Sequence, residues 1–196
     1  TFHRGPSLLL IMKSLLAAVW IVLFSLTAHG QVSSNDWTRS WPAWRGPLAN
    51  GVAPHANPPI EWSEKKNVRW KVALPGNGHS SPIVFGDRIY VLAAAPIGEA
   101  QPPVHDSAPG VHDSVPVTHT NQYMVIALHR TDGRILWKRV VREAWPHEGG
   151  HNTGSPASNS PVTDGEFIFA FFGSRGLYCL DTNGVIQWQR DLGKML

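Results

Sequence analysis

The segment His147-Glu148-Gly149-Gly150-His151 has the spacing of the zinc-protease motif H-E-x-x-H. In that motif two histidines on one face of a helix bind the metal, and the glutamate lies beside the bound water. Here Pro146 precedes the motif and two glycines occupy its centre, which disfavours a helix. We therefore predict a structural loop, and we keep a metal site or catalysis through His147 and His151 as weaker alternatives.

Three further histidines, His105, His112 and His119, lie in a Pro-rich stretch at about 93–120, in which His-Asp-Ser occurs twice. Histidines in such tracts can bind metal ions adventitiously. A stretch this polar and rich in proline cannot bury a core, so we predict a solvated loop that is disordered or loosely packed. We assign no metal site to it.

Cysteine chemistry is restricted to a single residue, Cys179. One cysteine cannot form an intrachain disulfide. It lies in the run Leu177-Tyr178-Cys179-Leu180, which has the character of a β-strand. We predict a buried, inert thiol.

The N-terminal region has the three parts of a secretory signal peptide. From Met12, one basic residue, Lys13, precedes an apolar run at 15–26, and Thr27-Ala28-His29-Gly30 follows. The apolar run is shorter than the roughly 20 residues that a membrane-spanning helix needs. We predict cleavage after Gly30 and export to the periplasm or the medium, with no stable membrane span afterwards. Residues 1–11 are an upstream or extended signal region.

The net charge gives no reason to expect a nucleic-acid partner. The chain has 17 basic and 14 acidic residues, and two of the basic ones, Arg4 and Lys13, precede the predicted cleavage site. The processed chain is therefore close to neutral, whereas nucleic-acid binding rests on clustered positive charge. We expect a protein or small-molecule partner instead.

An internal repeat determines the fold prediction. Residues 80–91 and 159–170 share a frame of Ser-Pro, a β-branched residue, Gly or Asp-Gly, and Ile next to an aromatic residue. Residues 127–137 and 179–188 also match, and each ends in Gly-x-x-x-Trp. Without the stretch at 93–120, each unit has the 40–50 residues of a propeller blade. The turn glycines Gly133 and Gly184 place Trp137 and Trp188 at fixed positions on the next strand, where an indole can cover the gap between blades. Trp70 is a third residue of this kind, on the strand entering the first blade.

These motifs, together with Trp-Pro-x-Trp-Arg-Gly-Pro at 41–47 and Gly-His-Ser-Ser-Pro at 78–82, resemble those of PQQ-binding-like β-propeller repeat proteins, where PQQ is pyrrolo-quinoline quinone. The resemblance covers about residues 41–194. It implies an all-β fold of four-stranded antiparallel blades, about two of the eight or so that close such a ring. The chain ends where a third blade should begin, so we expect an N-terminal fragment whose isolated product is marginally stable.

The predicted segments follow from the repeat. They are an upstream or extended signal region (1–11), the signal peptide (12–30), a Trp/Pro-rich extended segment (31–67), the first blade (68–141, with its insertion at 93–120), an inter-blade loop (142–160) and a second, truncated blade (161–196). His79, just before the first strand of the first blade, is a weak ligand-site candidate near the top or the central channel.

The resemblance makes PQQ a conceivable cofactor, but no cofactor is demonstrable from these residues. In quinoprotein dehydrogenases a vicinal disulfide stacks on PQQ and Ca²⁺ lies beside it. This chain has one cysteine and no acidic cluster suited to Ca²⁺. We therefore expect a noncatalytic scaffold or binding module with no catalytic or metal residues. The alternative is the N-terminal part of a PQQ-dependent dehydrogenase that oxidises alcohols or sugars.

Overall fold

The computed structural model describes residues 34–103, 114–147 and 149–194. The predicted signal peptide (12–30) and the upstream region (1–11) lie outside these ranges, as do His105, His112 and Glu148. In the ranges that are described, no helix has the length and apolar character needed to cross a bilayer.

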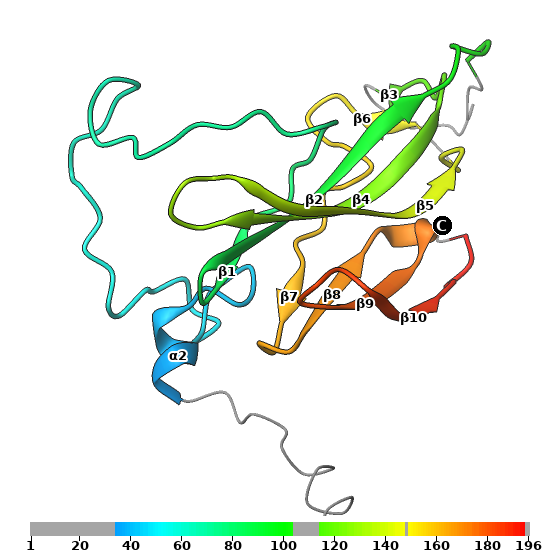
Figure 1. Ribbon diagram of the computed structural model, residues 1–196. Helices are drawn as coiled ribbons and strands as arrows, with labels where there is room; N and C mark the ends of the chain where they lie inside the picture. The colour runs from blue at the N-terminus through cyan, green and yellow to red at the C-terminus, as the bar shows by residue number, and fades with distance from the viewer. Residues whose placement is uncertain (1–33, 104–113, 148, 195–196) are drawn as a thin grey trace, which may run out of the picture. The chain divides into compact units, whose positions relative to one another are not determined.

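The chain folds into two four-stranded antiparallel sheets, and within each sheet the strands lie side by side in the order in which they occur along the chain (Figure 1). The first sheet has the order β1-β2-β4-β5, with β1 at Ile83–Phe85, β2 at Arg88–Ile97, β4 at Thr120–His129 and β5 at Ile135–Ala144. The second has the order β10-β9-β8-β7, with β7 at Val162–Thr163, β8 at Phe167–Phe171, β9 at Leu177–Asp181 and β10 at Ile186–Arg190. The predicted all-β fold with four-stranded propeller blades is confirmed.

Three short elements accompany the sheets. Helix α2 spans Ser34–Arg39, strand β3 (Ser114–Val115) pairs with strand β6 (Gly150–His151), and the 3₁₀ turn η1 spans Gly173–Arg175. The helix lies in the segment 31–67, which the sequence predicts to be extended, so that prediction is wrong at this point.

The hairpin turns form because their side chains and glycines suit tight turns. In the β9–β10 turn, Asp181 Oδ1 accepts hydrogen bonds from the backbone N–H of Asn183 and of Val185. Gly184 then adopts a φ of +80°, which favours glycine. The turn determines where β10 begins and therefore where Trp188 lies on that strand.

One apolar core lies between the sheets and takes residues from both. Alternate residues of each strand point into it, as the two-residue period of a strand requires. Its buried members include Ile83, Tyr90, Leu92 and Val125 from the first sheet, and Ile168, Ala170 and Leu180 from the second. A smaller cluster on the opposite face of the first sheet contains Val91, Ala93, Met124, Ile126 and Leu128. Strand β4 is consequently buried on both faces.

The predicted insertion at 93–120 begins and ends differently in the structure. Ala93 to Ile97 are the second half of β2 and pair in register with β4, from Ala93 opposite Met124 to Ile97 opposite Thr120. Ala93 and Ala94 are buried. The small alanine side chains allow the sheet to pack there, so these residues extend the hairpin and are not loose loop.

Two other details differ from the sequence interpretation. Trp70 lies in an irregular segment and not on a strand. Strand β5 continues to Ala144, three residues beyond the predicted end of the first blade at 141.

Candidate functional site

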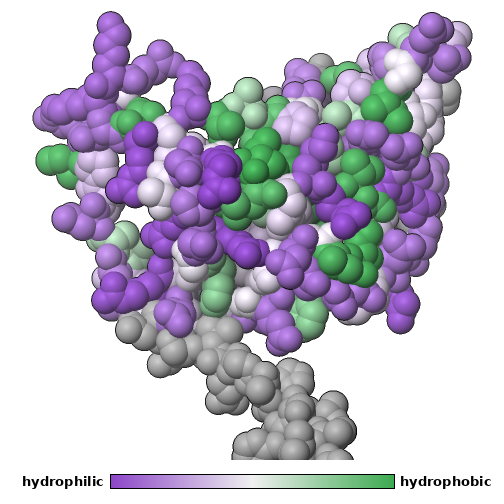
Figure 2. Space-filling model, in the orientation of Figure 1, coloured by the Kyte–Doolittle hydropathy of each residue, from purple (hydrophilic) through white to green (hydrophobic). Residues whose placement is uncertain are grey.

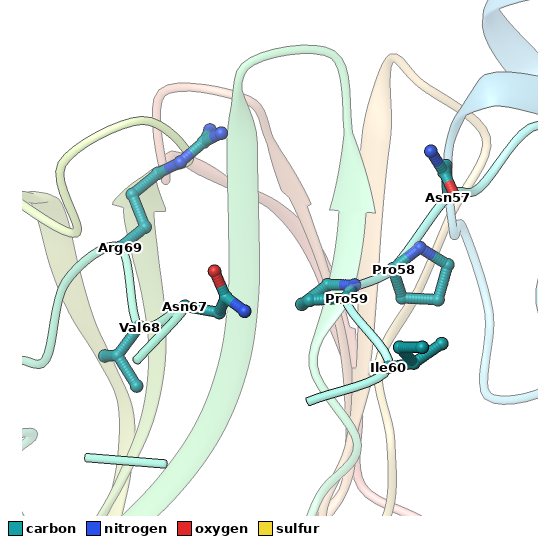
Figure 3. Close-up of a pocket in the computed structure, with 7 residues that line it drawn as sticks. All are labelled: Asn57, Pro58, Pro59, Ile60, Asn67, Val68 and Arg69. Carbon is teal, nitrogen blue, oxygen red and sulfur yellow. The ribbon is translucent and has the colours of Figure 1, made fainter. Parts of the chain in front are cut away.

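One hollow on the described surface has a volume of about 710 Å³ and is lined by residues of a single irregular segment, 57–69. Figure 3 shows Pro58, Pro59 and Ile60 on one side of it and Asn67, Val68 and Arg69 on the other. Ile60 is 99% exposed. Its lining has one charged residue, Arg69, and no pair of groups that could act together in catalysis, so we do not assign a function to it.

A second hollow, which we call the loop-end cleft, has a volume of about 500 Å³. It lies where the extended part of the β2–β4 hairpin meets the segments at 77–79, 115–121 and 146–156. Its lining residues are Asn77, His79, Ala94, Pro96, Val115, Pro116, Val117, Thr118, His119, Asn121, Pro146, Gly150, His151, Asn152, Gly154, Ser155 and Pro156. Apart from histidine, this lining contains no acidic or basic side chain.

Backbone hydrogen bonds hold the walls of the loop-end cleft in place. The N–H of Asn77 donates to the carbonyl of Ala94 and the N–H of Ala94 donates back, each at 2.8 Å. The N–H of His79 donates to the carbonyl of Ala157 at 3.1 Å. Since Ala94 is in the extended half of β2, the extra strand length of the first sheet positions this cleft.

Three histidines line the loop-end cleft: His79, His119 and His151. His119 Nδ1 lies 2.8 Å from the hydroxyl of Thr118, and His151 Nδ1 lies 2.7 Å from that of Thr153. These are contacts with near neighbours in the sequence. Across the residues that the structure describes, no three His, Cys, Asp or Glu side chains are grouped to hold a metal ion.

The two histidines of the H-E-x-x-H segment face different hollows. His151 is in β6 and lines the loop-end cleft, whereas His147 lines a neighbouring hollow of about 260 Å³. His147 Nε2 contacts the guanidinium of Arg175 at 2.8 Å. The arrangement differs from a zinc-protease helix, in which both histidines converge on one point.

This neighbouring hollow, which we call the arginine hollow, contains a residue that sequence reasoning missed. Arg175 is only 7% exposed although it carries a charge. Its Nη2 donates to the carbonyl of Trp145, and its Nε is buried and has no hydrogen-bond partner in the described part of the chain. The only signal in the sequence is a charged residue in a five-residue connection between two apolar strands.

Burial dominates the ionisation of the tyrosines at this end of the sheets. Burial raises the pKa of Tyr123 and of Tyr178 above the usual value, and nearby arginines oppose that rise. Arg142, which also lies here, is paired with Asp191 at 2.9 Å between Nη1 and Oδ2. Both tyrosines are therefore neutral, hydrogen-bonding groups near neutral pH.

Tryptophan rings cover turn glycines at three places, as pairs Trp41 with Gly46, Trp70 with Gly133, and Trp137 with Gly184. A Cβ built on Gly184 would lie 2.8 Å from Cδ2 of Trp137. Trp137 also donates its indole N–H to the carbonyl of Thr182 at 2.9 Å. A strand of the first sheet thereby contacts a turn of the second. Trp188 is 40% exposed, and its ring centroid lies 6.0 Å from that of Phe169.

Cys179 is 1% exposed, and burial, followed by the charge of Asp164, raises the pKa of its thiol. A thiol of this kind is a poor nucleophile because the thiolate is disfavoured. The predicted buried thiol is confirmed.

Comparison with protein-family models matches residues 31–195 to the family described as outer membrane protein assembly factor BamB. The matched region starts at Gln31, the residue after the predicted cleavage site. No curated protein matches the chain.

Proposed function

The chain belongs to the BamB family of PQQ-like repeat proteins and is a β-propeller binding or scaffold module; from this premise we propose that it is exported and binds a protein partner at the loop-end cleft without catalysing a reaction. Export is supported by the signal-peptide pattern at 12–30 and by the start of the family match at Gln31. A protein partner is supported by the family description, which names an assembly factor.

The observation that carries the proposal is the composition and construction of the loop-end cleft. A volume of about 500 Å³ lies within the usual range for ligand sites. Its walls combine proline and alanine with asparagine, threonine and histidine, which supply hydrogen bonds without a strong charge. Val115, at its rim, is 50% exposed. An uncharged wall of this kind suits a polypeptide segment, whose backbone and apolar side chains both need partners.

The groups in the cleft support binding better than they support chemistry. The backbone N–H of Thr153 and its hydroxyl both contact His151 Nδ1, at 3.2 and 2.7 Å, so this nitrogen closes a local turn. A general base needs a ring nitrogen aimed at a reacting group. Cys179, the chain's one thiol, is buried away from the surface.

Site-specific photo-cross-linking in intact cells tests the binding surface. A photoreactive amino acid at Val115, in the rim of the cleft, should give a discrete cross-linked product containing one envelope protein. The matched control is Val185, which is 48% exposed and lies in the β9–β10 turn. Equal cross-linking from both positions, or none from Val115, would contradict the proposal.

Export and the enzymatic alternative need separate experiments. N-terminal sequencing of the protein recovered from the cell envelope or the medium should begin at Gln31, and an unprocessed cytoplasmic chain would contradict export. Incubation with PQQ and Ca²⁺, followed by an assay of dye-linked alcohol oxidation, should show no turnover. Oxidation that depends on added PQQ would replace the binding role with that of a quinoprotein dehydrogenase.

A further inference from the structure

Arg175 carries a buried positive charge, and the groups of the described residues that its guanidinium contacts, the hydroxyl of Tyr123 included, are neutral. It lies in the turn η1 between β8 and β9 and is 7% exposed. Its Nη1 contacts His147 Nε2 at 2.8 Å, and its Nη2 donates to the carbonyl of Trp145. Its Nε has no hydrogen-bond partner among the residues that the structure describes. Burying a charge costs free energy unless the charge is paired, so a bound anion would stabilise this arginine.

No carboxylate among the described residues lies within ion-pair distance of Arg175. Among the described residues at this end of the sheets, Asp191 is paired with Arg142 at 2.9 Å, and Glu143 accepts a hydrogen bond from Gln122 at 2.7 Å. Asp191 also accepts a hydrogen bond from the N–H of Gly193 at 2.9 Å. Both carboxylates are thus already engaged.

His147 is prepared to act as a donor to a bound group. Its Nε2 faces an N–H of Arg175, so Nε2 must accept, and the ring is neutral with its proton on Nδ1. Partial desolvation, and then the charges of Arg175, Lys194 and Arg142, keep the pKa of His147 below its usual value. Its Nδ1–H has no partner within the described ranges and is available to a ligand.

The arginine hollow has the size and walls for one small group. Its volume is about 260 Å³. The rings of Tyr123 and Phe172 form part of its wall and lie edge to face, with centroids 5.5 Å apart. Arg175 and His147 are the ionisable basic side chains of its lining, and Ser155, Ser158, Asn159 and Ser174 are its uncharged polar residues. Aromatic walls with a guanidinium at one end suit an anionic group attached to a short apolar body.

We propose that the arginine hollow is an anion site that binds the carboxylate of a ligand through Arg175 and the Nδ1–H of His147. A carboxylate matches a single guanidinium in charge and, as a planar group with two oxygens, in geometry. The hollow shares Pro146, Gly150, Ser155 and Pro156 with the loop-end cleft. The carboxylate therefore belongs either to a free organic acid or to an acidic side chain of a polypeptide bound next door.

Nuclear magnetic resonance of the arginine Nε–H groups tests this site in the purified chain. Titration with benzoate at constant ionic strength should move the Arg175 Nε–H signal in a saturable manner, because its unpartnered proton senses the bound anion. A blocked Ala-Glu-Ala peptide, acetylated and amidated at its ends, provides the second arm. Saturation by benzoate alone indicates a free acid, and tighter binding of the peptide indicates a side chain. The proposal is overturned if neither probe shifts the Arg175 signal in a saturable manner. It is also overturned if the probes bind Arg175 no more strongly than they bind Arg142.

Variants locate the site and separate it from folding defects. Arg175→Lys keeps the charge and loses the two-pronged geometry, so binding should weaken about tenfold. His147→Phe, at an exposed position, removes the Nδ1–H and should weaken binding about fivefold even if the Arg175 variant does not fold. Arg142→Lys, whose native partner is Asp191, should leave the affinity within about twofold. Glu148 lies outside the described residues; if only Glu148→Gln binds benzoate, the chain supplies its own carboxylate and the proposal fails.

Discussion

The two sheets differ most in the length of their strands. Strands β2, β4 and β5 of the first sheet have ten residues each, whereas β8, β9 and β10 of the second have five. The strand segments that are present in both sheets form the common core. A hydrogen bond also joins equivalent residues of the repeat, because the N–H of Ser81 donates to Oγ of Ser160 at 2.9 Å. The additional length of the first sheet ends at the loop-end cleft. The repeated part of each blade therefore joins the two sheets, and the part unique to the first blade helps to form the proposed binding site.

Figure 2 shows that hydrophobic residues form separate patches among hydrophilic ones on the surface turned toward the viewer. Exposed apolar residues occur on strands of both sheets, and Ile135, Val162 and Trp188 are each about 40% exposed. Apolar side chains of this kind at blade edges suit contact with a neighbouring blade.

The largest expected effect is on the core that both sheets share. Ile168 is fully buried in that core, so Ile168→Ala should lower the free energy of unfolding by about 4 kcal/mol. Urea unfolding followed by tryptophan fluorescence and by far-UV circular dichroism measures this loss. Val185→Ala, at a residue that is 48% exposed, is the control and should change it by less than about 0.5 kcal/mol. Similar losses in both variants would refute a common core.

The second largest effect is expected where Trp137 contacts the β9–β10 turn of the second sheet. Gly184→Ala places a Cβ against the Trp137 ring at a φ of +80°, and should cost about 3 kcal/mol. Gly86→Ala also has a positive φ, +58°, but meets nothing within 4 Å, so it should cost only about 1 kcal/mol. The difference between the two losses in urea unfolding reports the contact between tryptophan and glycine. Equal losses would show that backbone strain alone is involved.

A smaller effect comes from a hydrogen bond between the sheets. Nε of Arg139, on β5, donates to the carbonyl of Gly184 at 2.7 Å in a partly buried position. Arg139→Ala should lower the free energy of unfolding by about 1.5 kcal/mol. Arg134→Ala, at a side chain that is 62% exposed, should cost under about 0.5 kcal/mol. If the two arginine variants lose the same free energy of unfolding, the hydrogen bond of Arg139 does not stabilise the contact between the sheets.

The smallest effect is the contribution of His147 to the pH dependence of stability. The pKa of this residue is lowered in the folded chain, by partial desolvation first and then by Arg175. The unfolded chain therefore binds the proton more tightly, and stability is lost as the pH falls below about 6.5 toward the folded pKa. His147→Gln should reduce the loss of melting temperature between pH 7.5 and 5.5. An unchanged loss would show that other groups cause it.

The repeated part of the fold could be predicted because the same residues recur there. In both blades, Ser-Pro precedes the first strand and Gly-x-x-x-Trp begins in the turn before the last strand. The sequence also pointed to Trp70, Trp137, Gly133 and Gly184, which the structure brings together in pairs. The blade-docking roles of Trp70, Trp137 and Trp188 stay predictions, and no glycine of the described residues contacts the Trp188 ring.

The extended hairpin and the arginine hollow could not be predicted. Ala93, Ala94 and Ala95 have little intrinsic preference for strand, and their pairing with β4 decides their conformation. Whether a charged residue such as Arg175 is buried depends on packing across the fold, which has no local pattern. The separation of His147 from His151 likewise results from the path of the loop and not from their spacing.

Hydrogen exchange of the chain in complex with its partner, isolated through the cross-link from Val115, tests the central claim most directly. The account predicts slowed exchange at 94–96, 115–121 and 150–156, which line the loop-end cleft, and unchanged exchange at 167–171 and 182–185. Slowed exchange confined to 182–185, in the β9–β10 turn, or spread equally over both sheets, would contradict it.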